Sequence, residues 1–114
     1  MIKTGYIAEL ENLKKNNPDA LFVKVCRPSI LGPSDLLFAE FKQLEKNTGS
    51  RIKAWEESNY KERYIKEIKS NPRAIEMIKF LKLQSENRDV FLICYEKEPP
   101  CHRFVLKTII DNSE

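Results

Sequence analysis

The sequence predicts a small single-domain α/β sandwich, with a largely parallel sheet flanked by helices, over residues 1–114. Two segments, 20–26 and 90–94, are short, apolar and rich in β-branched or aromatic residues, which is the pattern of buried strands. The segments between and after them repeat apolar residues at helical spacing. Strands that alternate with helices are typical of parallel sheets, because a helix carries the chain back across the sheet. No repeat, linker or low-complexity segment divides the chain, so one domain accounts for all of it.

The first quarter of the chain predicts a helix between two extended segments. Residues 1–6 are compatible with a first strand or an extended lead-in. Residues 8–16 follow a helical period, which Pro18 and its neighbours end. Residues 20–26 form a buried strand that ends before Pro28, because the residue before a proline disfavours the helical conformation.

The second quarter predicts a helix with a clear apolar stripe. Ser34 or Asp35 can cap its N-terminus, and Gly49 marks its end. Residues 51–55 are ambiguous, because alternating basic and apolar side chains fit either a short strand or an exposed loop, with Trp55 on the surface or in the core. The stripe consists of Leu36, Leu37, Phe38, Phe41 and Leu44.

Three more helices are expected in the rest of the chain. Ser58 or Asn59 can cap the first, and Pro72 suits the first position of the second. A turn at 85–88 leads into the strand at 90–94, and residues 101–110 form the closing helix. The expected buried faces are, in order, Tyr60, Tyr64, Ile65 and Ile68; Ile75, Ile78, Leu81 and Leu83; and Phe104, Val105, Ile109 and Ile110.

Composition restricts the class of protein. Twenty Lys and Arg against 17 Asp and Glu give a charge of +3, which permits an anionic partner but is small for a dedicated nucleic-acid binder. No apolar segment reaches the roughly 18 to 20 residues of a membrane span, and the N-terminus lacks the core of a signal peptide. We therefore expect a cytoplasmic protein without membrane contact, whose three cysteines are reduced thiols.

The reactive side chains gather after the two buried strands. Cys94 and Glu96 follow one strand, and Cys26, Arg27 and Ser29 follow the other. Loops after parallel strands converge at one edge of a sheet, and ligands bind there. If the strands are neighbours, these residues should therefore lie close to the Cys101-His102-Arg103 turn.

The residues expected at this edge of the sheet predict an anion-binding site. His102 and Arg103 in the first turn of a helix favour an anion by side-chain charge and by the helix end. Arg27, Ser29 and Arg103 are accordingly the candidate anion-binding residues. The alternative is that Arg103 pairs with Glu96 or Glu98 while His102 caps the loop.

The candidate catalytic residues are His102, Glu96 and Cys101. His102 could donate or shuttle a proton, and Glu96 could orient a neighbouring side chain. Cys101 is the better nucleophile, because a helix N-terminus with adjacent His and Arg lowers a thiol pKa. Adjacent helical residues point about 100° apart, however, which argues against His102 as the base for Cys101. Cys26 is expected to pack as a small hydrophobe.

Parts of the sequence are compatible with two other kinds of site, a zinc site and a single-strand binding surface. Zinc would need about four ligands, and Cys94, Cys101, His102 and Glu96 could supply them, but no Cys-x-x-Cys pair is present. The sequence therefore predicts no metal site and no cofactor. Residues 51–66 interleave aromatic and basic side chains as a single-strand binding surface might, but four glutamates interrupt them. An ordinary solvated helix face with core tyrosines is the favoured interpretation.

The segment from Leu92 to Lys97, followed by Cys101-His102-Arg103, resembles the motif of domain-of-unknown-function family 488. Thr4-Gly5-Tyr6, Arg27-Pro28-Ser29 and Tyr64 extend the resemblance over almost the whole chain. It implies an α/β fold and a pocket near Cys94, Glu96, His102, Arg103 and Arg27, but no established reaction. Members typically carry an acid where this chain has Lys24, which places any role of that acid in doubt.

Three functional hypotheses follow. The preferred one is a phosphate- or nucleotide-type anion site, in which Arg27 and Arg103 hold the anion and His102 handles a proton. The second is a non-catalytic interaction domain in which the Cys-His-Arg motif ties the central strand to the last helix. The third is weak nucleic-acid binding through residues 51–66. The oligomeric state is not predicted.

Overall fold

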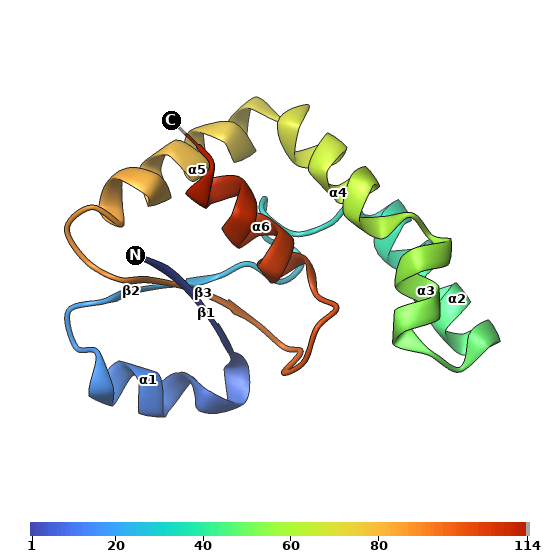
Figure 1. The fold of residues 1–114 in the computed structure, drawn as a ribbon, viewed down its shortest axis with the longest axis horizontal. Coiled ribbons are helices and arrows are strands. Elements are labelled where there is room, and N and C mark those ends of the chain that lie inside the picture. Colours follow the sequence, from blue (N-terminus) through green and yellow to red (C-terminus); the bar gives the residue numbers. More distant parts are fainter. Residues whose placement is uncertain (114) are drawn as a thin grey trace.

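Three parallel strands lie at the centre of the computed structural model, which describes residues 1–113 (Figure 1). They are β1 (Ile2–Tyr6), β2 (Leu21–Lys24) and β3 (Val90–Cys94), in the order β1-β3-β2. Every residue of β3 is buried, as expected of a central parallel strand. The predicted α/β fold is confirmed, and the first residues of the chain form a strand.

The register brings the carboxyl ends of the strands together. Ile2 and Leu21 both pair with Val90, so β1 and β2 start at the same level of β3. Beyond β2, the Val25 N–H still donates to the Ile93 carbonyl at 2.8 Å. The residues after β2 and β3 therefore leave the sheet at one edge.

The described chain contains six α-helices. They are α1 (Leu10–Asn16), which follows a 3-10 turn at Ile7–Glu9, α2 (Asp35–Thr48), α3 (Arg51–Glu57), α4 (Tyr60–Lys69), α5 (Pro72–Gln84) and α6 (His102–Asp111). Of these, α2 and α3 lie beyond the end of the sheet (Figure 1). Ser34 caps α2 by accepting the Leu37 N–H at 3.2 Å, and Gly49 ends it in the left-handed conformation. Pro72 stands at the start of α5, as predicted.

Residues 51–55 form a helix, so neither the strand nor the loop expected there is correct. The Ser50 hydroxyl accepts the Lys53 N–H at 3.2 Å and caps α3. Trp55 is half-buried, and its ring stacks on Tyr60 with centroids 4.2 Å apart. The amphipathic helix is therefore stabilised by its cap and by packing against a neighbouring helix, which short-range alternation does not reveal.

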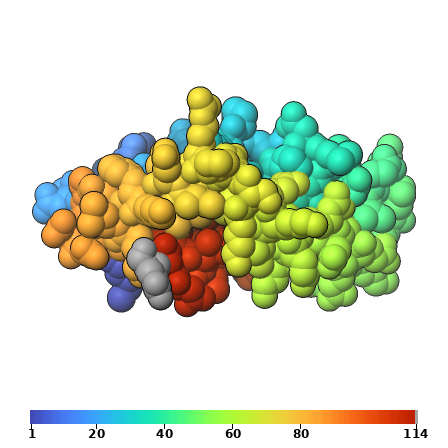
Figure 2. Space-filling model, turned by 90° about the horizontal axis from the view of Figure 1, so that it is seen from above, coloured from blue at the N-terminus to red at the C-terminus, as the bar shows by residue number. Residues whose placement is uncertain are grey.

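The helices form layers on the sheet. In Figure 1, α1 lies on one side of the strands, whereas α6 lies on the other, beneath α4 and α5. Gly5 allows the approach of α1, because a Cβ there would lie 2.7 Å from a methyl group of Leu13. Figure 2, seen from above, shows α4 and α5 across the middle of the molecule, with part of α6 exposed beside them and α2 and α3 at one end.

The buried face of α5 differs from the expected one. Ala74, Ile78 and Leu81 are buried, whereas Ile75 is half-buried and Leu83 is 58% exposed. The face contacting α4 and α6 is thus narrower than the apolar pattern suggested. Within residues 1–113, the helices are too short or too polar to cross a membrane.

Candidate functional site

A cavity of about 200 Å³ opens at the edge of the sheet where β2 and β3 end. Its reactive lining comes from three places: the residues after β2, the residues after β3, and the start of α6. These residues are Cys26, Arg27, Cys94, Glu96, Cys101 and His102. The expectation that the two strand ends meet is confirmed, because β2 and β3 are hydrogen-bonded neighbours.

Aromatic residues from the helices form another wall of this cavity. They are Phe38 and Phe41 of α2, Trp55 of α3 and Tyr60 of α4, and the cationic Lys42 and Arg51 accompany them. Such a mixture of apolar walls and a few converging polar groups is typical of small-molecule sites.

His102 is held in one orientation on the cavity wall. Its Nε2 lies 2.6 Å from the Val25 carbonyl oxygen, and the edge of the ring packs on Tyr64 with centroids 5.4 Å apart. A carbonyl oxygen can only accept, so Nε2 is the donor and Nδ1 carries the lone pair in the neutral ring. That lone pair is on the side of Cys101, whose Sγ is 3.8 Å from Nδ1.

The position of Cys101 corrects one expectation. Cys101 is the N-cap of α6, with an extended backbone (φ −157°, ψ 145°), and the helix starts only at His102. The angle of about 100° between adjacent helical side chains therefore does not apply. The thiol and the imidazole face each other, so the argument against His102 as a partner for Cys101 was wrong.

The two buried thiols, Cys94 and Cys101, differ in pKa in opposite directions from the usual value of a thiol. Hydrogen bonding from the Cys94 thiol lowers the pKa of Cys101, against the effect of burial, and His102 contributes to the lowering. The same thiol pair and burial raise the pKa of Cys94. Cys101 is thus the more acidic thiol, as a position at a helix start beside a histidine favours.

Arg103 lies outside the cavity. It is only 2% exposed, and its two Nη atoms donate to the backbone carbonyls of Glu96 and Lys97. The guanidinium also packs over the Phe104 ring, 4.4 Å from its centroid. In the described chain it therefore contacts neither carboxylate that was considered as its partner, and it supports the loop after β3.

The residues at and after the end of β2 differ in whether they reach the cavity: Arg27, like Cys26, lines it, whereas Ser29 and Lys24 do not. Arg27 is exposed at the cavity, pairs with Asp35 and lies over the Phe38 ring. Ser29 instead accepts the Leu31 N–H at 3.1 Å and closes a turn. Lys24 is exposed at the end of β2 and is not part of the lining.

Arg51, like Lys42, is a cavity residue that sequence reasoning did not place at the site. Its guanidinium donates to the Pro100 carbonyl and lies 3.8 Å from the Glu96 carboxylate. The sequence placed Arg51 in a basic segment, but only the packing of α3 beside the loop after β3 brings it here. Nothing in its local sequence signals this position.

The two tyrosines of the basic and aromatic segment lie in the core. Tyr60 and Tyr64 are 5% and 0% exposed, and Trp55 is stacked on Tyr60. Burial raises the pKa of both tyrosines, which keeps them neutral. The interpretation of these tyrosines as core residues is confirmed.

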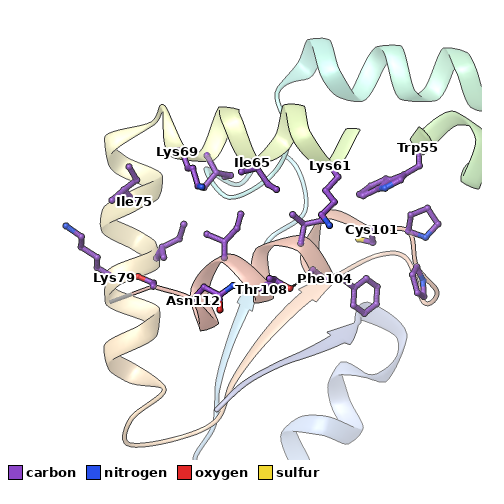
Figure 3. Close-up of a pocket in the computed structure, with 17 residues that line it drawn as sticks. Trp55, Lys61, Ile65, Lys69, Ile75, Lys79, Cys101, Phe104, Thr108 and Asn112 are labelled. Carbon is purple, nitrogen blue, oxygen red and sulfur yellow. Dashed lines mark hydrogen bonds between the residues drawn. The ribbon is translucent and has the colours of Figure 1, made fainter. Parts of the chain in front are cut away.

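A larger groove of about 650 Å³ lies between α4, α5 and α6 (Figure 3). Its walls are mainly apolar, and Lys61, Lys69 and Lys79 also line it. Trp55, Pro100 and Cys101 border both the groove and the smaller cavity. In Figure 3 the Cys101 sulfur is at the end of the groove next to Trp55, so this thiol stands between the two hollows.

These features define a small parallel α/β domain with a cysteine–histidine cavity at the carboxyl edge of its sheet. A family model described as the active DUF488-N3 subclade, DUF488-N3a, matches residues 15–114. The chain therefore belongs to the DUF488 family, as the Cys-His-Arg motif indicated. No curated protein and no solved structure gives a significant match.

Proposed function

We propose that this domain binds a small phosphate-type anion in the cavity at the end of β2 and β3. The observation that carries the proposal is the charge of the lining, which includes the cations Arg27, Lys42 and Arg51 and, within the described chain, the one carboxylate of Glu96. Asp35 and Glu45, which do not line the cavity, pair with these cations from outside it. A cavity with an excess of cations and low-dielectric walls concentrates anions. Its position outside the carboxyl ends of parallel strands is also where such sheets bind ligands.

The cationic groups remain able to bind a ligand. The partner of Arg27 is Asp35, whose side chain is 93% exposed, and exposed ion pairs contribute only about 0 to 1 kcal/mol. A phosphate can therefore displace that carboxylate. Arg51 is anchored by the Pro100 carbonyl, and a guanidinium has five N–H donors, so further donors can reach a ligand.

The size of the cavity restricts the ligand. Drug-sized ligands occupy pockets of about 300 to 1,000 Å³, and this cavity holds about 200 Å³. It accepts a phosphate group with a small organic substituent, and a complete nucleotide would extend beyond it. The ligand class is therefore a small phosphate ester or one end of a nucleotide.

The same cavity offers groups that could act on the ligand. Cys101, His102 and Glu96 all line it, so an anion held by Arg27 and Arg51 would lie beside a thiol, an imidazole and a carboxylate. His102 accepts or donates a proton at Nδ1 while Val25 holds its other nitrogen. The description of the matching subclade as active supports a catalytic role for this cluster.

Calorimetric titration tests the anion site. Inorganic phosphate, nucleoside monophosphates and sugar phosphates would be titrated into the wild type, Arg27→Gln and Arg51→Gln. Loss of a charge-assisted hydrogen bond worth about 1.5 to 3 kcal/mol should weaken binding about 10- to 150-fold. Arg73→Gln, on the exposed face of α5, is the matched control and should bind like the wild type. Binding by none of these anions, or equal binding by all four proteins, would contradict the proposal.

A second function is favoured by the contacts of the motif itself. His102 ties α6 to the residue after β2, and Arg103 ties it to the loop after β3. These contacts suit a motif with a purely structural role, in a domain whose function is to bind another protein. In that case no anion would bind, and His102→Ala would lower the melting temperature without changing any ligand affinity.

A further inference from the structure

We infer that Cys94, Cys101 and His102 form a zinc-type metal site whose fourth coordination position faces the cavity. This inference deepens the proposed function, because it rests on the same cavity for the ligand that would meet the metal. The sequence predicted no metal site, since seven positions separate the two cysteines and no Cys-x-x-Cys pair is present. The fold joins these residues by running β3 into a loop that returns at the start of α6.

The spacing of the three ligand atoms suits a tetrahedral ion. Zn–S and Zn–N distances of about 2.3 and 2.1 Å place two sulfurs about 3.8 Å apart, and a sulfur and a nitrogen about 3.6 Å apart. The Cys101 Sγ and His102 Nδ1 are 3.8 Å apart, and all three atoms lie within 4.8 Å of one another. Shifts of about 1 Å or less, within reach of side-chain rotation, would complete the geometry.

The imidazole is already oriented as a metal ligand. Metal-bound histidines usually donate their other N–H to a carbonyl or carboxylate, which fixes the tautomer and the ring. The Val25 carbonyl accepts from Nε2 at 2.6 Å and leaves the Nδ1 lone pair on the side of the sulfurs.

The chemistry and number of ligands indicate the type of site. Two thiolates and an imidazole select zinc over magnesium or calcium, which prefer oxygen ligands. Structural zinc sites use four protein ligands, whereas catalytic sites use three and leave one position for water or substrate. Glu96 is not part of the cluster, and its carboxylate lies 3.8 Å from the Arg51 guanidinium. The fourth position is therefore available to an oxygen of the anion held by Arg27 and Arg51.

Cobalt and zinc titrations of the reduced, metal-free protein test this inference. Cobalt should bind at one equivalent per chain and give both thiolate-to-metal charge-transfer absorption and the intense visible bands of tetrahedral Co²⁺. Zinc should displace it, and a chromophoric chelator in competition measures the zinc affinity. Replacing a second-shell partner typically costs 10- to 100-fold, so Cys94→Ser, Cys101→Ser and His102→Gln should each cost more than about 100-fold.

Cys26→Ser is the matched control, because Cys26 is a buried thiol of the same cavity but not part of the cluster. It should keep the wild-type affinity and cobalt spectrum, and circular dichroism would check the fold of each variant. If a cysteine variant does not fold, His102→Gln and the wild-type spectrum still decide. The inference is wrong if the wild type binds no cobalt or zinc stoichiometrically, if the cobalt spectrum lacks thiolate charge transfer, or if Cys26→Ser loses as much affinity as Cys101→Ser.

The metal site and the anion site can fail separately. Phosphate binding would be measured for the zinc-loaded and for the zinc-free protein. If the protein binds zinc but neither form binds phosphate, the metal site is supported and the proposed function is rejected. Phosphate binding to a protein that binds no zinc would do the reverse.

Discussion

Replacing Arg103 by methionine separates its structural role from an anion-binding role. The methionine keeps most of the buried apolar volume but removes the donors to the carbonyls of Glu96 and Lys97. Each charge-assisted bond contributes about 1.5 to 3 kcal/mol when buried, and these two carbonyls are only partly buried. We therefore expect the lower end for each bond, and a loss of about 3 kcal/mol in the free energy of unfolding.

This loss is large enough to measure by two methods. An unfolding entropy of about 2.1 cal/mol/K per residue gives about 0.24 kcal/mol/K for a chain of this length, so the melting temperature should fall by about 12 °C. Urea denaturation followed by circular dichroism should show a lower midpoint at unchanged slope.

Arg73→Met is the control for this experiment, because Arg73 is exposed on α5. Exposed substitutions of this kind usually change stability by less than about 0.5 kcal/mol. If Arg103→Met were as stable as Arg73→Met, the loop support by Arg103 would be refuted. If it kept its stability but lost phosphate binding, the anion-binding role expected from the sequence would replace it.

Three further predictions concern the core. Gly5→Ala should lower the free energy of unfolding by about 1 kcal/mol in urea denaturation, the low end for overpacking, because the ends of the Leu13, Ile93 and Glu9 side chains, at 2.7, 3.0 and 3.1 Å from the new methyl, would have to move; an unchanged midpoint would refute these contacts. Tyr64→Phe should cost about 1 to 3 kcal/mol in the same assay, because it leaves a buried carbonyl that the hydroxyl bonds at 2.5 Å. Stability should fall as pH rises above about 10, because the raised pKa of Tyr60 and Tyr64 keeps them protonated in the folded state while they ionise on unfolding. Each of these two tyrosines lowers the free energy of unfolding by up to about 1.4 kcal/mol per pH unit in this range, so Tyr60→Phe or Tyr64→Phe should make its dependence on pH less steep. The control Tyr95→Phe, at an exposed position, should leave this pH dependence unchanged.

The central strand and the site at its end follow directly from the sequence. Residues 90–94 are apolar throughout and too few for a helix, which indicates a strand buried on both faces, and in a parallel sheet the reactive residues after it lie at the sheet edge. The neighbouring position of β2 then brought Cys26 and Arg27 to the same place. These features depend on local pattern and on one general rule of parallel sheets.

Two features depend on information that the local sequence does not carry. The closing helix starts one residue later than expected, and this shift alone turns Cys101 toward His102. Helix boundaries are uncertain by one or two residues from sequence, yet here one residue decides the chemistry. The structure places Arg51 at the cavity, where the sequence predicted Arg103. This difference depends on the packing of α3 beside a loop some 50 positions away in the chain, where Arg51 contacts Pro100.

The most direct test of the cavity as a ligand site is an NMR titration of the ¹⁵N-labelled protein with inorganic phosphate and a nucleoside monophosphate. We predict saturable shifts in the backbone amides of Arg27, Arg51, Glu96 and His102, which weaken in Arg27→Gln and Arg51→Gln. Shifts that are absent, or that cluster on the groove between α4, α5 and α6 instead, would contradict the account.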